Sequence, residues 1–281
     1  MNIKELPGGL LRKIGVNRNS NKYILFQKIY WALSGQQERY RTFSQFGEDQ
    51  ILRAFFPEKI GSYLDIGGGN YRHGNNTYFL YKKGWSGIVI EPITSFSRGY
   101  KLHRKRDKLI RACFSSEPSE SHPFYEFHPW QLSTMSKERC TELQARGIEP
   151  RRVHEVPTLT IKSLNLQIKP LEPFLLCIDV EGAETEVLSG ADWGTFRPRV
   201  ICVEDFGNPI ANQTPIKSLL VNLGYQLISQ AFLSSIYAHS DYLREGFFAK
   251  SLGLYDSTES VQSNESNTSI TKDEKSNKLK S

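Results

Sequence analysis

Short apolar stretches alternate with amphipathic ones along the chain, and this pattern predicts alternating strands and helices. The segment 62–66 (SYLDI) is apolar and is followed by three consecutive glycines. The pattern of residues 75–83 predicts a helix that ends before Gly84, and the segment 88–90 (IVI) is apolar again. Near-continuous apolar strands are typical of a parallel sheet that is covered on both faces. This part of the chain therefore predicts a strand, glycine turn, helix and second strand.

The same alternation continues towards residue 228. Further strands are predicted at 108–114, 174–180, 200–203 and 225–228, and helices at 183–189 and 215–223. The order favours an α/β fold with a doubly wound, mostly parallel sheet. Such sheets bind ligands at the carboxyl ends of their strands, near the switch in strand order. The polar stretch 115–157 is long for a connection, so we expect some of the substrate contacts there.

Composition divides the chain into three parts. Residues 1–41 carry eight Lys or Arg against two acids, a net charge of +6 that equals the formal charge of the whole chain. We expect a basic, helical N-terminal arm there, a folded domain at 42–250 and a disordered tail at 251–281, which has few apolar residues. No apolar run is long enough to span a membrane and no signal peptide is evident, so we expect a cytoplasmic protein.

The basic arm has two interpretations. Between Ile24 and Leu33 its apolar and aromatic residues fall partly at helical spacing, with Lys28 among them. Such a helix either makes weak contact with an anionic membrane surface or packs on the folded domain as a lid. A second basic run, 98–111, has little aromatic interleaving, so a solvated helix face fits it better than a nucleic-acid surface.

The glycine turn carries the first candidate chemistry. Gly67 and Gly69 let the backbone approach a ligand closely, and Asp65 either orders the loop by accepting backbone N–H bonds or meets a ligand ammonium. Glu91 follows the next strand, 24 residues after Gly67, where a carboxylate can accept both hydroxyls of a ribose. These residues predict a nucleoside cofactor.

The identity of that nucleoside depends on position 72. A dinucleotide turn needs its third glycine there, but the chain has Arg72. S-adenosylmethionine (SAM) has no pyrophosphate and does not need that glycine, so SAM is favoured over NAD. An NAD- or nucleotide-sugar-dependent oxidoreductase and a catalytically silent SAM-binding module remain as alternatives.

Three carboxylates cluster after the strongest strand. Asp179 lies where the sheet presents its ligands and either orients the methyl donor or acts as a base, and we assign a catalytic role to Asp179 and Glu181. Glu184 falls in the first turn of a helix, where an acid suits the helix dipole. Glu204 and Asp205 end another strand and, with Asp179, have the oxygen ligands that a divalent metal prefers.

Together these motifs resemble the FkbM family of methyltransferases. The resemblance spans residues 43–206 and rests on 44–49 (SQFGED), the Asp65 loop, Asn76-Thr77, 82–85, 90–92 and 179–184 (DVEGAE). It implies a methyltransferase domain at 42–250 with a Rossmann-like class I SAM-dependent fold. It also implies O-methylation of a hydroxyl on a sugar, glycan or natural product.

The resemblance further implies that Gln45 and Glu48 close over the cofactor. We therefore expect a SAM site made of Gln45, Glu48, Asp65, Gly67, Gly69, Glu91 and Asp179. The chain departs from the family in its glycine loop, where 68–71 (GGNY) replaces the more usual Ala-Asn-Asp-Gly and an acid is lost.

Overall fold

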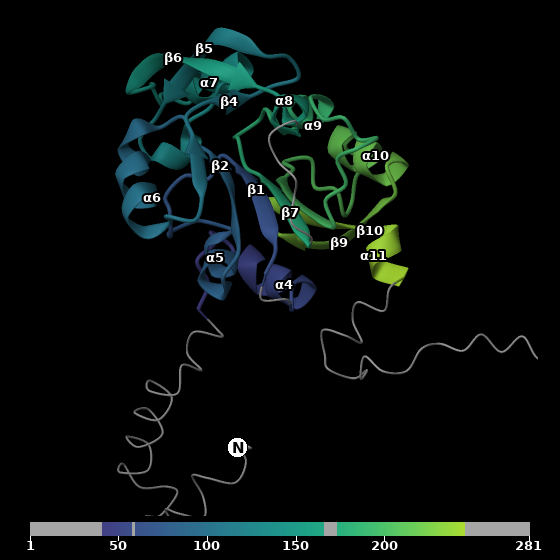
Figure 1. Ribbon diagram of the computed structural model, residues 1–281. Coiled ribbons are helices and arrows are strands. Elements are labelled where there is room, and N and C mark those ends of the chain that lie inside the picture. The colour runs from purple at the N-terminus through teal and green to yellow at the C-terminus, as the bar shows by residue number, and fades with distance from the viewer. Residues whose placement is uncertain (1–40, 58–59, 166–172, 245–281) are drawn as a thin grey trace, which may run out of the picture.

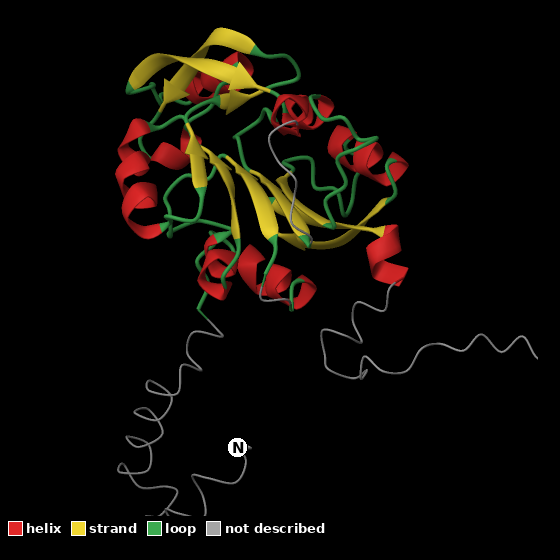
Figure 2. Cartoon of the chain, viewed as in Figure 1, coloured by secondary structure: helices red, strands yellow, loops and turns green. Residues whose placement is uncertain are grey.

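The apolar segments form a seven-stranded sheet in the computed structural model, which describes residues 41–57, 60–165 and 173–244 (Figures 1 and 2). The strand order is β3 (Lys108–Ile110), β2 (Ser86–Ile90), β1 (Ser62–Ile66), β7 (Phe174–Ile178), β8 (Val200–Glu204), β10 (Ser234–His239) and β9 (Tyr225–Ala231). The first five strands are parallel, and β10 runs antiparallel to both of its neighbours. The predicted α/β fold with a mostly parallel sheet is therefore confirmed.

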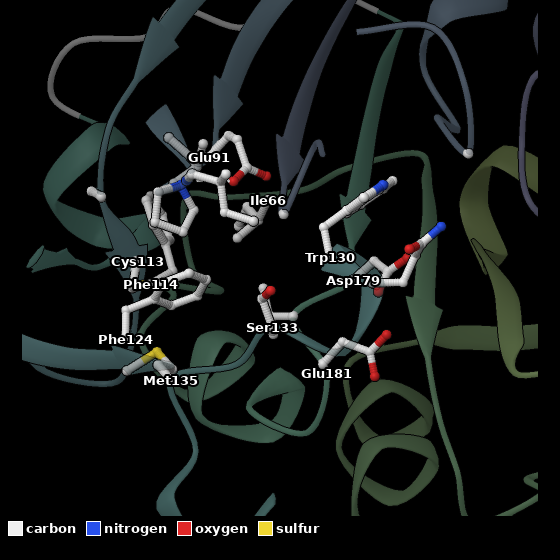
Figure 3. A pocket seen from close by; sticks show the side chains of 18 of the residues that line it. Ile66, Glu91, Cys113, Phe114, Phe124, Trp130, Ser133, Met135, Asp179 and Glu181 are labelled. Atoms are coloured by element: carbon white, nitrogen blue, oxygen red, sulfur yellow. Dashed lines mark hydrogen bonds between the residues drawn. The ribbon is translucent and has the colours of Figure 1, made fainter. Parts of the chain in front are cut away.

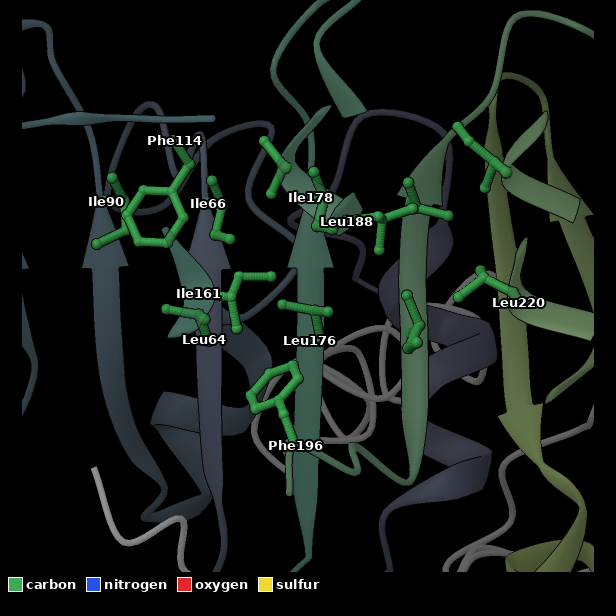
Figure 4. Close-up of a cluster of buried hydrophobic side chains, with 14 of the residues drawn as sticks. Leu64, Ile66, Ile90, Phe114, Ile161, Leu176, Ile178, Leu188, Phe196 and Leu220 are labelled. Carbon is green, nitrogen blue, oxygen red and sulfur yellow. The ribbon is translucent and has the colours of Figure 1, made fainter. Parts of the chain in front are cut away.

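Helices cover both faces of this sheet because its strands alternate between two cores. On β1, Tyr63 packs with the helices α4 (Glu48–Phe55), α5 (Tyr78–Lys83), α6 (Ser97–His103) and α11 (Ser240–Arg244). Leu64 and Ile66 point to the other face and pack with α8 (Ile161–Asn165), α9 (Glu184–Ser189) and α10 (Pro215–Asn222). Figure 4 shows this second core against the strands.

The polar stretch 115–157 is folded rather than a plain connection. It contains β5 (Ser119–Glu126), the short 3-10 helix η2 (Trp130–Leu132) and α7 (Lys137–Ala145), and its end enters β6 (Arg152–Leu159). With β4 (Cys113–Phe114), these strands form a separate sheet in the order β4-β6-β5. This small sheet lies above the main sheet in Figure 1.

Two strand predictions need correction. The predicted strand 108–114 is divided: β3 pairs with β2 of the main sheet, whereas β4 pairs with β6 of the small sheet. The chain leaves the main sheet between them because β4 joins the inserted strands. The strand β10 was not predicted, and it separates β8 from β9.

Two other expectations concern parts of the chain outside this description. The predicted N-terminal arm, of which only Arg41 is described, and the predicted tail at 251–281 lie outside the described residues. Among the residues that are described, no helix combines the length and the apolar character needed to cross a membrane.

Candidate functional site

The site begins where the strand order reverses, between β1 and β7. The parallel strands, counted along the chain, have the spatial order 3-2-1-4-5, so neighbouring connections leave in opposite directions at this point. Here the two backbones touch: the Asp179 N–H donates to the Ile66 carbonyl at 3.0 Å. Gly67 has a φ of +82°, and a Cβ at this position would lie 1.8 Å from the Asp179 carbonyl oxygen. Only glycine fits both conditions.

A cavity opens at these strand ends, and residues from both sides of the strand switch line it. Figure 3 shows Glu91, Cys113, Phe114 and Phe124 on one side and Asp179 and Glu181 on the other. The cavity therefore has an apolar half that contains one carboxylate and an acidic half that contains two.

Glu91 is fixed in the apolar half by the backbone. Its two carboxylate oxygens accept hydrogen bonds from the N–H groups of Gly69 at 2.7 Å and Ile93 at 2.6 Å. The residue is 4% exposed, and burial raises the pKa of its carboxyl to about 7 although both hydrogen bonds lower it. Glu91 is therefore a positioned acceptor whose charge changes near neutral pH.

Asp65 orders the glycine loop, as one of its two suggested roles had it, but through side-chain donors. One of its oxygens accepts from the Thr77 hydroxyl at 2.5 Å and from the Asn75 amide at 3.3 Å, so side chains rather than backbone N–H groups hold it. Asn75 also donates to the Gly68 carbonyl at 2.8 Å. Asp65 thus orders the glycine loop from the side away from the cavity, and it is not among the described residues that line the cavity.

Arg104 completes this support, and the sequence did not single it out. Six of the seven basic residues at 98–111 are exposed, as predicted for a solvated face, but Arg104 is only 1% exposed. It donates to the Tyr63 hydroxyl at 2.8 Å, the Thr77 hydroxyl at 2.9 Å and the Asn75 amide oxygen at 3.0 Å. Its guanidinium therefore anchors the two side chains that hold Asp65.

The acidic half brings three carboxylates together. Oxygens of Asp179, Glu181 and Glu204 all lie within 4.8 Å of one another. Burial raises the pKa values of all three, and the neighbouring carboxylates raise them further. The Arg139 guanidinium approaches Glu181 at 3.9 Å and also lies over the Phe206 ring, 5.1 Å from its centroid. Arg139 lowers the pKa values of Glu181 and Glu204, but burial outweighs this effect.

A strained turn aims Glu181 at the cavity. Glu181 has a φ of +55°, which is uncommon for a residue with a side chain, and Gly182 follows at +107°. The Glu184 carboxylate holds this turn by accepting from the N–H groups of Val180 and Gly182. The polar stretch 115–157, here called the insertion, also contributes: its Thr134 hydroxyl donates to the Glu181 carbonyl at 2.9 Å. Glu184 therefore stabilises the turn, and strain of this kind is concentrated at functional sites.

The structure brings only some of the predicted site residues to the cavity. Its lining includes Gln45, Gly67, Glu91, Asp179 and Glu181, whereas Glu48, Asp65 and Gly69 are not part of it. Glu48 is buried and accepts from the Phe46 N–H at 2.8 Å and the Ser234 hydroxyl at 3.0 Å, so it ties the segment before α4 to β10. Gly69 contributes through the N–H that holds Glu91.

The suggested metal ligands separate in the same way. Glu204 joins the acidic cluster, but Asp205 accepts from the Gly207 N–H at 3.0 Å and the Thr214 hydroxyl at 2.6 Å. Thr214 caps the start of α10, so Asp205 serves that helix rather than the cluster.

The insertion supplies lining residues that the sequence reasoning did not identify: Phe124, Trp130, Gln131, Ser133 and Met135. Trp130 packs so closely on the glycine loop that a Cβ on Gly69 would lie 2.6 Å from its ring. Aromatic residues within a polar stretch were the available signal, but the pattern did not show which of them faced the site.

Comparison with known proteins adds one match. Residues 65–227, more than half of the chain, match the family model described as the methyltransferase FkbM domain. The matched region begins at Asp65 and includes Glu91, Asp179 and the insertion. No curated protein gives a match to the chain.

Proposed function

The chain belongs to the FkbM family of methyltransferases, and we propose that it transfers a methyl group from SAM to a hydroxyl oxygen. The observation that carries this proposal is the divided cavity at the strand switch, with an apolar half around Glu91 and an acidic half around Asp179 and Glu181. The order of the parallel strands supports a Rossmann-like class I fold, with the hairpin of β9 and β10 completing one edge.

The apolar half fits a nucleoside. Ile90, Ala112 and Phe114 offer apolar contacts for a base, and Glu91 offers oxygens to the hydroxyls of a ribose. Gly67 has no Cβ, so its backbone lies directly against the Asp179 carbonyl at the edge of the cavity. SAM, when bound, would supply a methyl group on a sulfonium.

The acidic half fits an acceptor that must lose a proton. Transfer of a methyl group to a hydroxyl forms a C–O bond, breaks the C–S bond of the donor and releases one proton. Asp179 and Glu181 line the cavity, so a carboxylate oxygen of either residue is placed to take that proton. A site that excludes water and fixes both reactants also supplies much of the rate enhancement.

The family match favours this function over an NAD- or nucleotide-sugar-dependent oxidoreductase. The glycine loop agrees, because Arg72 stands where a dinucleotide turn needs its third glycine. A sugar, glycan or natural product is the acceptor class that the resemblance implies, and the insertion is the part of the cavity wall best placed to select it.

Two measurements test the proposal. Isothermal titration with S-adenosylhomocysteine should show one site per chain, and [methyl-³H]SAM should label an acceptor in a fractionated cell lysate. Absence of binding at millimolar S-adenosylhomocysteine would overturn SAM dependence. Binding without transfer to any fraction would instead support the catalytically silent module.

A further inference from the structure

Three carboxylates from three separate segments meet at the acidic wall of the cavity. Asp179 directly follows β7, Glu181 lies in the strained turn before α9, and Glu204 is the last residue of β8. One oxygen from each lies within 4.8 Å of the other two. Like charges at this separation repel one another, so the arrangement is stable only when protons or a cation neutralise part of the charge.

Glu204 shows that the described residues leave this compensation incomplete. The residue is 8% exposed, and its Oε2 atom has no hydrogen-bond partner in the part of the chain that the structure describes. A buried carboxylate oxygen without a partner is strongly unfavourable unless a ligand completes it. Arg139 offsets only part of the charge, because it approaches Glu181 no closer than 3.9 Å and also bonds Glu142 at 3.0 Å.

We propose that Asp179, Glu181 and Glu204 bind one hard divalent cation, such as Mg²⁺ or Mn²⁺. Such ions prefer carboxylate oxygens at about 2.0 to 2.4 Å, so two ligands of one ion lie at most about 4 to 5 Å apart. The distances between the three carboxylate oxygens, at most 4.8 Å, agree with this range. Three acidic ligands without sulfur or imidazole favour Mg²⁺ and Mn²⁺ over Zn²⁺.

The position of this ion has a consequence for the acceptor, which rests on the proposed function. Asp179 and Glu181 also line the cavity, so the ion would border the acidic half and leave coordination positions open towards it. An acceptor oxygen that occupied one of these positions would be oriented, and negative charge on it would be stabilised. Each residue would give one oxygen to the ion, so the second carboxylate oxygen of Asp179 or Glu181 remains as the acceptor for the proton that the hydroxyl releases.

The test uses the full chain freed of metal by chelation and dialysis. Isothermal titration with Mn²⁺ and with Mg²⁺ should show one site per chain, and the midpoint of thermal unfolding should rise with Mn²⁺ concentration. Glu204→Gln has nearly the same shape and should fold, but its affinity for Mn²⁺ should fall at least tenfold and its unfolding midpoint should no longer respond. Glu120→Gln, at an exposed position on β5, is the matched control and should bind Mn²⁺ as the unmodified chain does.

The outcomes separate this proposal from the proposed function. No binding of either ion at millimolar concentration, or equal Mn²⁺ affinity in Glu204→Gln and the unmodified chain, would overturn the metal site. S-adenosylhomocysteine titrated into the same samples reports on the cofactor site by itself. Binding of S-adenosylhomocysteine without binding of metal rejects only the cation, and the reverse result rejects only the SAM proposal.

Discussion

The ionisation of Glu91 should control the affinity for SAM and its product. Its two oxygens are held by backbone N–H groups and face the apolar half of the cavity. Ribose hydroxyls are donors there, so they need the carboxylate as an acceptor. Burial raises the pKa of Glu91 to about 7. In the ligand-free chain the neutral acid therefore predominates below pH 7, and the dissociation constant should rise as the pH falls.

The size of the effect follows from this pKa. Between pH 8 and pH 6 the ionised fraction falls from about nine-tenths to about one-tenth, so the dissociation constant should rise about tenfold. The same shift has an opposite effect on folding. A raised pKa contributes stability that is fully present below the unfolded value of about 4.5 and is lost as the pH rises through 7, which amounts to about 3 kcal/mol.

Glu91→Gln tests both effects in one variant. Isothermal titration with S-adenosylhomocysteine at pH 6, 7 and 8 should show the tenfold slope in the unmodified chain and a flat response in the variant. At pH 8 the variant should bind about 30-fold more weakly, because one charge-assisted pair of hydrogen bonds is worth roughly 2 kcal/mol. Because only Glu91 is changed, the variant also shows whether the pH dependence comes from Glu91 or from the other acids of the cavity. A dissociation constant that is constant across this range, or an equal slope in the variant, would refute the assignment.

Three further substitutions have distinct expected results. Gly67→Ala should destabilise the fold by about 3 kcal/mol or more in urea unfolding, because its Cβ would collide with the Asp179 carbonyl and the φ is positive; unchanged stability would contradict the close approach. Arg104→Lys should lower the unfolding free energy by about 2 to 4 kcal/mol, because an ammonium cannot reach Tyr63, Thr77 and Asn75 together. Asp179→Asn should leave the unfolding midpoint nearly unchanged but lower kcat about 100-fold in the methyl-transfer assay; a rate equal to that of the unmodified chain would exclude the catalytic role.

Sequence patterns were sufficient for the central part of the fold. The apolar runs at 62–66, 174–180 and 200–203 became β1, β7 and β8, because a strand buried on both faces needs apolar residues at nearly every position. The predicted helix at 75–83 begins three residues later, at Tyr78, because the Asn75 side chain accepts the Tyr78 N–H and forms a turn before it. Local residue chemistry therefore fixed these elements.

The pairing of strands that lie far apart in the sequence could not be predicted from local patterns. The division of 108–114 depends on β6, more than forty residues later, which takes β4 into the small sheet. The place of β10 between β8 and β9 depends on antiparallel pairing that no local pattern encodes. Partners that lie far apart in the sequence decide these features.

The site shows the same division between local and distant information. Gly67, Glu91 and Asp179 were identified because each directly follows a recognisable strand, and parallel strands bring such positions to one edge. Asp65 lies within β1, one residue before its end, and points away from the cavity, since residues of one strand alternate between its faces and Ile66 is the one that lines the cavity. The rule of strand ends therefore finds the right edge of the sheet but not the direction of each side chain.

Glu204 shows what only the assembled structure reveals about chemistry. In the sequence Glu204 and Asp205 are equivalent acids after one strand, and both fitted a metal-binding interpretation. In the fold Asp205 has the Thr214 hydroxyl and the Gly207 N–H as donors, whereas the Oε2 atom of Glu204 has no partner among the described residues. Because satisfied carboxylates stabilise structure and unsatisfied buried ones do not, the contrast between these neighbours assigns Asp205 to the helix cap. The same contrast leaves Glu204 as the residue whose burial is best explained by a ligand.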